Sequence, residues 1–94
     1  MITNNEKYWN KYYQSQKKKS PASNFAKFIN KKFLKKKDIV LDVATGNGRD
    51  AFFLSKYTKF VFGIDKSKIA IDINNKKADY LDLNNISFKN LKSQ

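Results

Sequence analysis

The chain contains no cysteine and no histidine. Without cysteine, disulfide bonds, thiolate metal sites and a cysteine nucleophile are excluded. Without histidine, the commonest general base and the commonest ligand of transition metals are missing. No apolar run approaches the ~18 residues of a membrane span, and the polar amino end, Met1–Glu6, lacks the apolar region of a signal peptide. We therefore expect a cytoplasmic protein that makes no contact with a membrane.

Acidic residues are also scarce, and the net charge is +12, which by itself suggests a nucleic-acid partner. However, Arg49 is the single arginine among the 20 basic residues. Dedicated nucleic-acid surfaces favour arginine, whose planar group makes two-point contacts with phosphate and guanine. Lysine, asparagine and isoleucine share A/T-rich codons, so genome composition explains much of the lysine excess. We interpret the charge as a solvated surface, and a nucleic-acid binder stays as a minor alternative.

The length of 94 residues limits the chain to one small domain, and its 40% hydrophobic content is enough for a core. Within residues 4–18, four aromatic residues at i, i+4 spacing predict one stripe on a helix. The stripe consists of Tyr8, Trp9, Tyr12 and Tyr13. It is either a face that docks on the domain or a lid over a ligand.

A second helix is predicted over residues 22–34, where apolar residues recur three and four positions apart. Pro21 suits the start of this helix. The lysines that follow, at 31–32 and 35–37, complement the dipole at its carboxyl end. We therefore expect residues 1–37 to form an amino-terminal cap of two helices.

The remaining chain, 38–94, alternates apolar strands with helices. The near-continuous apolar run Ile39–Val43 predicts a strand buried on both faces. Further strands are expected at 60–64, ending at Asp65, and at 86–88, with helices at 50–57 and 67–81. The inward positions expected on the last helix are Ile69, Ala70, Ile73 and Ala78. This alternation predicts an α/β fold with a parallel, Rossmann-like sheet joined by right-handed crossovers.

The stretch Ile39–Asp50 runs from the first strand through two glycines into a helix. Gly46 and Gly48 lack Cβ, so the backbone can turn sharply and approach a ligand. The following helix presents free N–H groups at its amino end. Asp65 closes the next strand, where a carboxylate can accept hydrogen bonds from both hydroxyls of a ribose. The combination predicts a cofactor that contains a nucleoside.

The glycines alone do not decide which cofactor binds, because Gly46, Gly48 and Ala51 also satisfy the looser dinucleotide fingerprint. An NAD-binding oxidoreductase domain therefore stays an alternative. Asp42 lies four residues before Gly46, where a pyrophosphate would meet an uncompensated carboxylate. A cofactor carrying an ammonium and a sulfonium group would instead be attracted there. This favours S-adenosylmethionine, although the glycines could form a simple tight turn and Asp65 could simply cap a helix.

The segment Leu41–Asp50 resembles motif I of the class I S-adenosylmethionine-dependent methyltransferases, whose form is D-x-G-x-G-x-G. Ala44 stands here at the first glycine of that motif. Gly63–Ser67 resembles the acidic second motif of the family. The helix with Tyr8 and the segment Ser20–Ala26 are similar to the amino-terminal cap of members that act on small molecules. The resemblance implies S-adenosylmethionine as cofactor and a small molecule as methyl acceptor.

The resemblance also implies roles for individual residues. Asp42 and the turn backbone would hold the methionine portion, Asp65 the ribose hydroxyls, and Lys66 or Ile64 would flank the adenine. The cofactor-binding residues expected are Asp42, Ala44, Thr45, Gly46, Asn47, Gly48, Asp65 and Lys66. The cap segment Ser20–Phe25 is expected to reach the cofactor, whereas Arg49 and Asp50 are expected to be surface or first-turn residues. No residue can be assigned as a catalytic base, and no metal is expected.

The sheet of this family continues beyond a third strand, whereas the sequence supplies strands 1 to 3. We therefore expect an amino-terminal portion of a methyltransferase that holds the cofactor. The outer edge of strand 1 would then lack a neighbour, which favours self-association through that edge. The alternative is a non-catalytic, cofactor-binding module or remnant that needs a partner chain.

Overall fold

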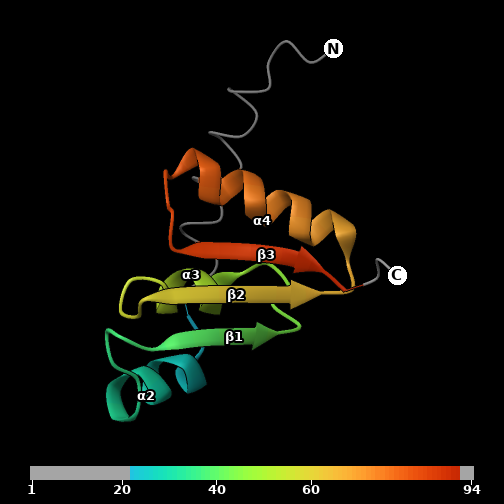
Figure 1. Cartoon of the computed structure of the whole chain (residues 1–94). Helices are drawn as coiled ribbons and strands as arrows, with labels where there is room; N and C mark the ends of the chain where they lie inside the picture. Colours follow the sequence, from blue (N-terminus) through green and yellow to red (C-terminus); the bar gives the residue numbers. More distant parts are fainter. Residues whose placement is uncertain (1–21, 92–94) are drawn as a thin grey trace, which may run out of the picture.

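The computed structural model describes residues 22–91 of the chain. Helices and strands alternate along these residues, and the strands form one three-stranded sheet (Figure 1). The elements are α2 (Asn24–Lys32), β1 (Ile39–Val43), α3 (Arg49–Leu54), β2 (Phe60–Asp65), α4 (Lys68–Tyr80) and β3 (Ile86–Asn90). The predicted α/β fold is confirmed. The predicted helix within residues 4–18 and its aromatic stripe lie outside the described residues.

The sheet has the order β1-β2-β3, and both pairs of neighbouring strands are parallel. Val40 of β1 lies opposite Val61 of β2, which in turn lies opposite Ile86 of β3. In this register the carboxyl ends of β1 and β2 meet at one edge of the sheet. The residues that follow both strands, including the glycine turn after β1, are therefore neighbours in space.

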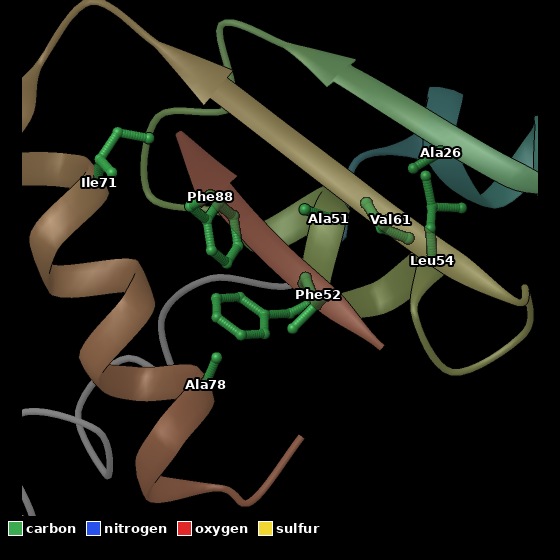
Figure 2. Close-up of a cluster of buried hydrophobic side chains, with 9 residues drawn as sticks. Ala26, Ala51, Phe52, Leu54, Val61, Ile71, Ala78 and Phe88 are labelled. Carbon is green, nitrogen blue, oxygen red and sulfur yellow. The ribbon is translucent and has the colours of Figure 1, made fainter. Parts of the chain in front are cut away.

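The core lies between one face of this sheet and the helices α3 and α4 (Figure 2). Val61, Ile86 and Phe88 point from the sheet into this layer. The Phe88 ring packs against Phe52 of α3, with 5.2 Å between the ring centroids. Ala26 of α2 belongs to the same cluster, so the described part of the predicted cap is packed onto the domain.

The prediction that β1 is buried on both faces is wrong in this structure. Ile39, Leu41 and Val43 are 61%, 59% and 62% exposed. The physical reason is the handedness of the connections. Two right-handed crossovers that both step from β1 towards β3 place their helices on the same side of the sheet. The apolar run was sufficient to predict a strand, but not to predict what covers its second face.

The inward face of α4 differs in part from the prediction. Ala78 is buried as expected, and Ala70 and Ile73 are partly buried. Ile69, however, is 74% exposed, whereas Ile71 and Asn74 are buried. Ser67 sets the start of the helix, because its side chain accepts a hydrogen bond from the Ala70 backbone N–H at 3.1 Å. In the helix that begins there, the stripe of Ile71, Asn74 and Ala78, at i, i+3 and i+7, faces the sheet, and Ile69 lies on the outside.

The two edges of the sheet differ. At the outer edge of β3, the Asn75 side chain accepts a hydrogen bond from the Phe88 N–H (3.2 Å) and donates one to the Phe88 carbonyl (3.1 Å). At the outer edge of β1, no strand is paired within residues 22–91. The helices of this part of the chain are too short or too polar to cross a membrane.

Candidate functional site

The turn between β1 and α3 has an unusual backbone. Ala44, Gly46 and Gly48 adopt positive φ angles of 60°, 56° and 77°. Glycine adopts such angles without steric cost, whereas a residue with a Cβ is strained by about 1–2 kcal/mol. Gly48 is also the N-cap of α3 and makes no side-chain capping bond. At Gly46 and Gly48 no side chain stands between the backbone and the edge of the sheet.

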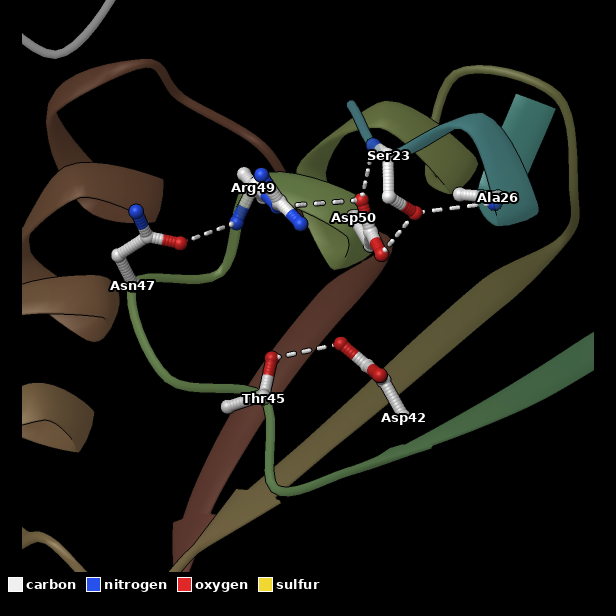
Figure 3. A network of polar contacts seen from close by, with 7 residues as sticks. All are labelled: Ser23, Ala26, Asp42, Thr45, Asn47, Arg49 and Asp50. Atoms are coloured by element: carbon white, nitrogen blue, oxygen red, sulfur yellow. Dashed lines mark hydrogen bonds and ion pairs between the residues drawn. The ribbon is translucent and has the colours of Figure 1, made fainter. Parts of the chain in front are cut away.

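Thr45 anchors this turn to both strands. Its backbone N–H donates to the Ile64 carbonyl at 2.9 Å, and its hydroxyl donates to the Asp42 carboxylate at 2.8 Å (Figure 3). Burial raises the pKa of Asp42 above its usual value, and the nearby charge of Asp50 adds to this, although the Thr45 bond acts in the opposite direction. A cationic ligand that binds beside such a half-buried carboxylate stabilises its ionised form.

Asp65, at the end of β2, holds the turn from the other side. Its carboxylate accepts one hydrogen bond from the Ser67 N–H and another from the Gly46 N–H, both at 2.9 Å. These two bonds, the Ser67 bond first, lower the pKa of Asp65. Asp65 is not the helix cap that the sequence left open as an alternative, because the N-cap of α4 is Ser67 and Asp65 bonds the N–H of Ser67. Each carboxylate oxygen retains a further lone pair, so the group can also accept bonds from ligand hydroxyls.

Asn74 of α4 was not identified from the sequence. Its side chain is 1% exposed, and its amide donates to the Gly46 carbonyl at 2.7 Å. A buried amide needs such a partner, because an unsatisfied polar group in the core is costly. The available signal was a polar residue at a core-facing spacing on an amphipathic helix. Asn74 and Asp65 together hold both backbone polar groups of Gly46.

The other predicted residues lie at the rim of the site. The Asn47 side chain is exposed and accepts a hydrogen bond from the Arg49 N–H at 3.1 Å. Lys66 is exposed directly after Asp65. Asp50, which was expected to be a surface or first-turn residue, lies in the first turn of α3 and contacts Ser23 at the start of α2 (Figure 3).

The structure thus brings together four of the predicted residues. Asp42 and Thr45 form one pair, and Gly46 and Asp65 form another, on either side of the positive-φ turn. The arrangement offers a half-buried carboxylate, a second carboxylate with spare acceptor capacity, and a backbone that a ligand can approach closely. Such a set can hold a ligand that carries both a cationic group and hydroxyls.

Comparison with protein families matches residues 34–92 to the family described as "Methyltransferase domain". No curated protein matches the chain. Among solved structures, a Streptococcus mutans protein described as a methyltransferase, in complex with SAH, is similar at 30% identity. The TM-score is 0.61, with 67% of this chain and 35% of that chain covered. A SAM-dependent methyltransferase from Aquifex aeolicus is 31% identical, with a TM-score of 0.57 and coverage of 73% and 38%.

The YcgJ protein of Bacillus subtilis shares the fold at 23% identity and a TM-score of 0.64, with 69% of this chain and 28% of that chain covered. Because the family match extends over more than half of the sequence, the chain belongs to the methyltransferase-domain family. The predicted family, the class I methyltransferases, and the predicted Rossmann-like fold are confirmed. The chain spans 28% to 38% of the length of these three solved structures.

Proposed function

We propose that this chain binds S-adenosylmethionine at the turn between β1 and α3 and serves in methyl transfer. The observation that carries the proposal is the positive-φ turn held between Asp42 and Asp65. An ammonium and a sulfonium group would compensate the half-buried carboxylate of Asp42. The hydroxyls of a ribose fit the spare acceptor capacity of Asp65. The similar Streptococcus mutans structure contains SAH.

In this proposal the residues of the chain act by binding and orientation. Asp42, Ala44, Thr45, Gly46, Asn47 and Gly48 hold the methionine portion, Asp65 holds the ribose, and Lys66 lies beside the adenine. S-adenosylmethionine would supply the methyl group: in-line attack of the acceptor on the methyl carbon would break its bond to the sulfonium sulfur and release S-adenosylhomocysteine. The protein's contribution is to position the donor and to exclude water, so no side chain of this chain is assigned as a catalytic base.

The proposal predicts that replacing Asp65 weakens cofactor binding. S-adenosylhomocysteine should bind the wild-type chain in a calorimetric titration, and Asp65→Ala should lower its affinity by about tenfold to a hundredfold, the value of hydrogen bonds to a charged group. Absence of binding to the wild-type chain would refute the proposal. Tight binding of NADH in its place would instead support the oxidoreductase alternative.

Ser67→Ala is the matched control for this experiment. It removes the side-chain cap of α4, the 3.1 Å bond from Ala70, next to the contact that Asp65 makes with Ser67. Loss of such a cap costs about 0.5–2 kcal/mol of stability. Ser67→Ala should therefore lower the urea midpoint while the affinity for S-adenosylhomocysteine is kept. An equal loss of affinity in both variants would assign Asp65 to the fold rather than to the ligand.

We also propose that the methyl acceptor is a small molecule. The support is the similarity of the Ser20–Ala26 segment to the cap of family members that act on small molecules. The cytoplasmic location expected from the sequence stays a prediction.

A second candidate function is a cofactor-binding module that needs a partner chain. The exposed apolar residues Ile39, Leu41 and Val43 favour it, as does the outer edge of β1, which pairs with no strand among the described residues 22–91. Pairing of β1 with β1 of a second copy would satisfy that edge, whereas the net charge of +12 opposes it. Sedimentation equilibrium should therefore show a dimer whose population rises towards about 1 M salt, where charges are screened within about 3 Å. A monomer at all salt concentrations would exclude this self-association.

A further inference from the structure

Ser23 and Asp50 make a two-point contact between segments that are distant in the sequence. The Ser23 backbone N–H and hydroxyl each donate a hydrogen bond of 2.7 Å, one to each oxygen of the Asp50 carboxylate (Figure 3). Hydrogen bonds to an ionised acceptor are about twice as strong as neutral ones, and a two-point contact also fixes orientation. This contact is therefore a firm connection between α2 and α3.

Ser23 is at the same time the N-cap of α2. Its hydroxyl oxygen accepts a hydrogen bond from the Ala26 N–H at 3.0 Å, while the hydroxyl proton is given to Asp50. Ala26 is buried in the core cluster next to α3. One side chain thus fixes where α2 begins and how its first turn lies against the domain.

Asp50 is equally well placed on the other side of the contact. It lies in the first turn of α3, two residues after Gly48, where a carboxylate is favoured by the helix dipole. It makes no capping bond within α3; both oxygens are used by Ser23, and Arg49 approaches at 3.7 Å from an exposed position. The contact therefore connects α2 directly to the end of the turn proposed to hold the cofactor.

We propose that Ser23 and Asp50 form a clamp that holds the start of α2 against the glycine turn and thereby sets the affinity for the cofactor. The inference rests on the proposed function. Ser23 lies in the cap segment that was expected to reach the cofactor, but its N–H and its hydroxyl are both bonded to Asp50. In this proposal both are therefore positioning residues, which act through the turn. A turn that is already fixed loses less conformational freedom when a ligand binds, so the affinity is higher. Loosening the clamp therefore weakens binding even though Asp42 and Asp65 are unchanged.

A double-mutant cycle tests the clamp. Ser23→Ala, Asp50→Ala and the double variant are titrated with S-adenosylhomocysteine under conditions in which circular dichroism shows each to be folded. Each single variant should lower the affinity about fivefold to twentyfold. The double variant should bind no more weakly than the single variant that has the lower affinity. Alanine is a good helix former, so Asp50→Ala does not weaken α3 through propensity. Unchanged affinities, or losses that multiply in the double variant, overturn the clamp.

Two further variants separate positioning from general stability. Ser23→Thr keeps a hydroxyl and should retain most of the affinity that Ser23→Ala loses. Asp38→Ala removes a carboxylate that accepts a hydrogen bond from the Lys35 N–H at 2.8 Å, just before β1 begins and away from the glycine turn. It should lower stability without lowering affinity. Equal loss of affinity in Asp38→Ala would show that stability alone is responsible.

Hydrogen exchange distinguishes failure of the clamp from failure of the proposed function. A wild-type chain that does not bind S-adenosylhomocysteine overturns the proposed function and the effect of the clamp on affinity. The existence of the contact between Ser23 and Asp50 is then tested by exchange in the absence of ligand. Exchange at the Ser23 and Ala26 amides should become at least about tenfold faster in Asp50→Ala, relative to the Val61 amide in the core. Unchanged protection of these two amides overturns the contact as well.

Discussion

Gly63→Ala is expected to lower the free energy of unfolding by about 1–3 kcal/mol, the cost of overpacking a core. A Cβ at this position would lie 2.6 Å from the Phe88 ring and 2.9 Å from the Thr45 hydroxyl. Neither neighbour can move freely. The Phe88 ring packs against Phe52, and the Thr45 hydroxyl is bonded to Asp42. Urea unfolding measures the effect, and an unchanged midpoint would contradict this account of the packing.

Ala44→Gly is the matched control, because it removes a Cβ from the same region, whereas Gly63→Ala adds one. Ala44 has a φ of 60°, so the substitution relieves about 1–2 kcal/mol of left-handed strain. The larger entropy of glycine in the unfolded chain offsets about 0.4–1 kcal/mol of this stabilisation. The Ala44→Gly variant should therefore be as stable as the wild type or slightly more stable.

Asp42→Asn is expected to change stability and cofactor affinity in opposite directions. Burial raises the pKa of Asp42 above 3.8, so folding at neutral pH holds an ionised carboxylate in surroundings that disfavour it. Asparagine removes that charge, and its carbonyl can still accept the hydrogen bond from Thr45. The unliganded variant should therefore have the higher urea midpoint. Its affinity for S-adenosylhomocysteine, which carries an ammonium group, should fall about tenfold or more.

The pH dependence of stability gives an independent check on Asp42. Because the folded chain binds this proton more tightly than the unfolded chain, stability falls as the pH rises from 3.8 through the raised pKa. The advantage of Asp42→Asn should accordingly be complete at neutral pH and should shrink as the pH falls towards 3.8. A difference between variant and wild type that is constant over this range would contradict the assignment.

The strands, the parallel sheet and the glycine turn could be predicted because their signals are local. The run Ile39–Val43, the pair Gly46 and Gly48, and Asp65 each carry their meaning within a few residues. The family resemblance then narrowed a general nucleotide turn to a methyltransferase, and the family match agrees with it.

The contacts that hold the site could not be predicted, because they join residues far apart in the sequence. Asn74 lies 28 residues from Gly46, and Ser23 lies 27 residues from Asp50. Periodicity assigns a residue to a face of a helix but does not identify its partner. Asn74 was left without a role for this reason, and Asp50 was expected to be a surface or first-turn residue with no partner identified for it. The exposed face of β1 is a further case, because it depends on which side both crossover helices occupy.

The side chain of Asn75 has a consequence for how copies of this chain could assemble. Because it occupies the N–H and the carbonyl of Phe88, it acts as a short substitute for a neighbouring strand at that residue of the outer edge of β3. A sheet with two open edges can polymerise without limit, as in a fibre, whereas a sheet with one open edge can add a single neighbour. If copies pair through β1 as proposed above, Asn75 would therefore disfavour the addition of a further copy at β3.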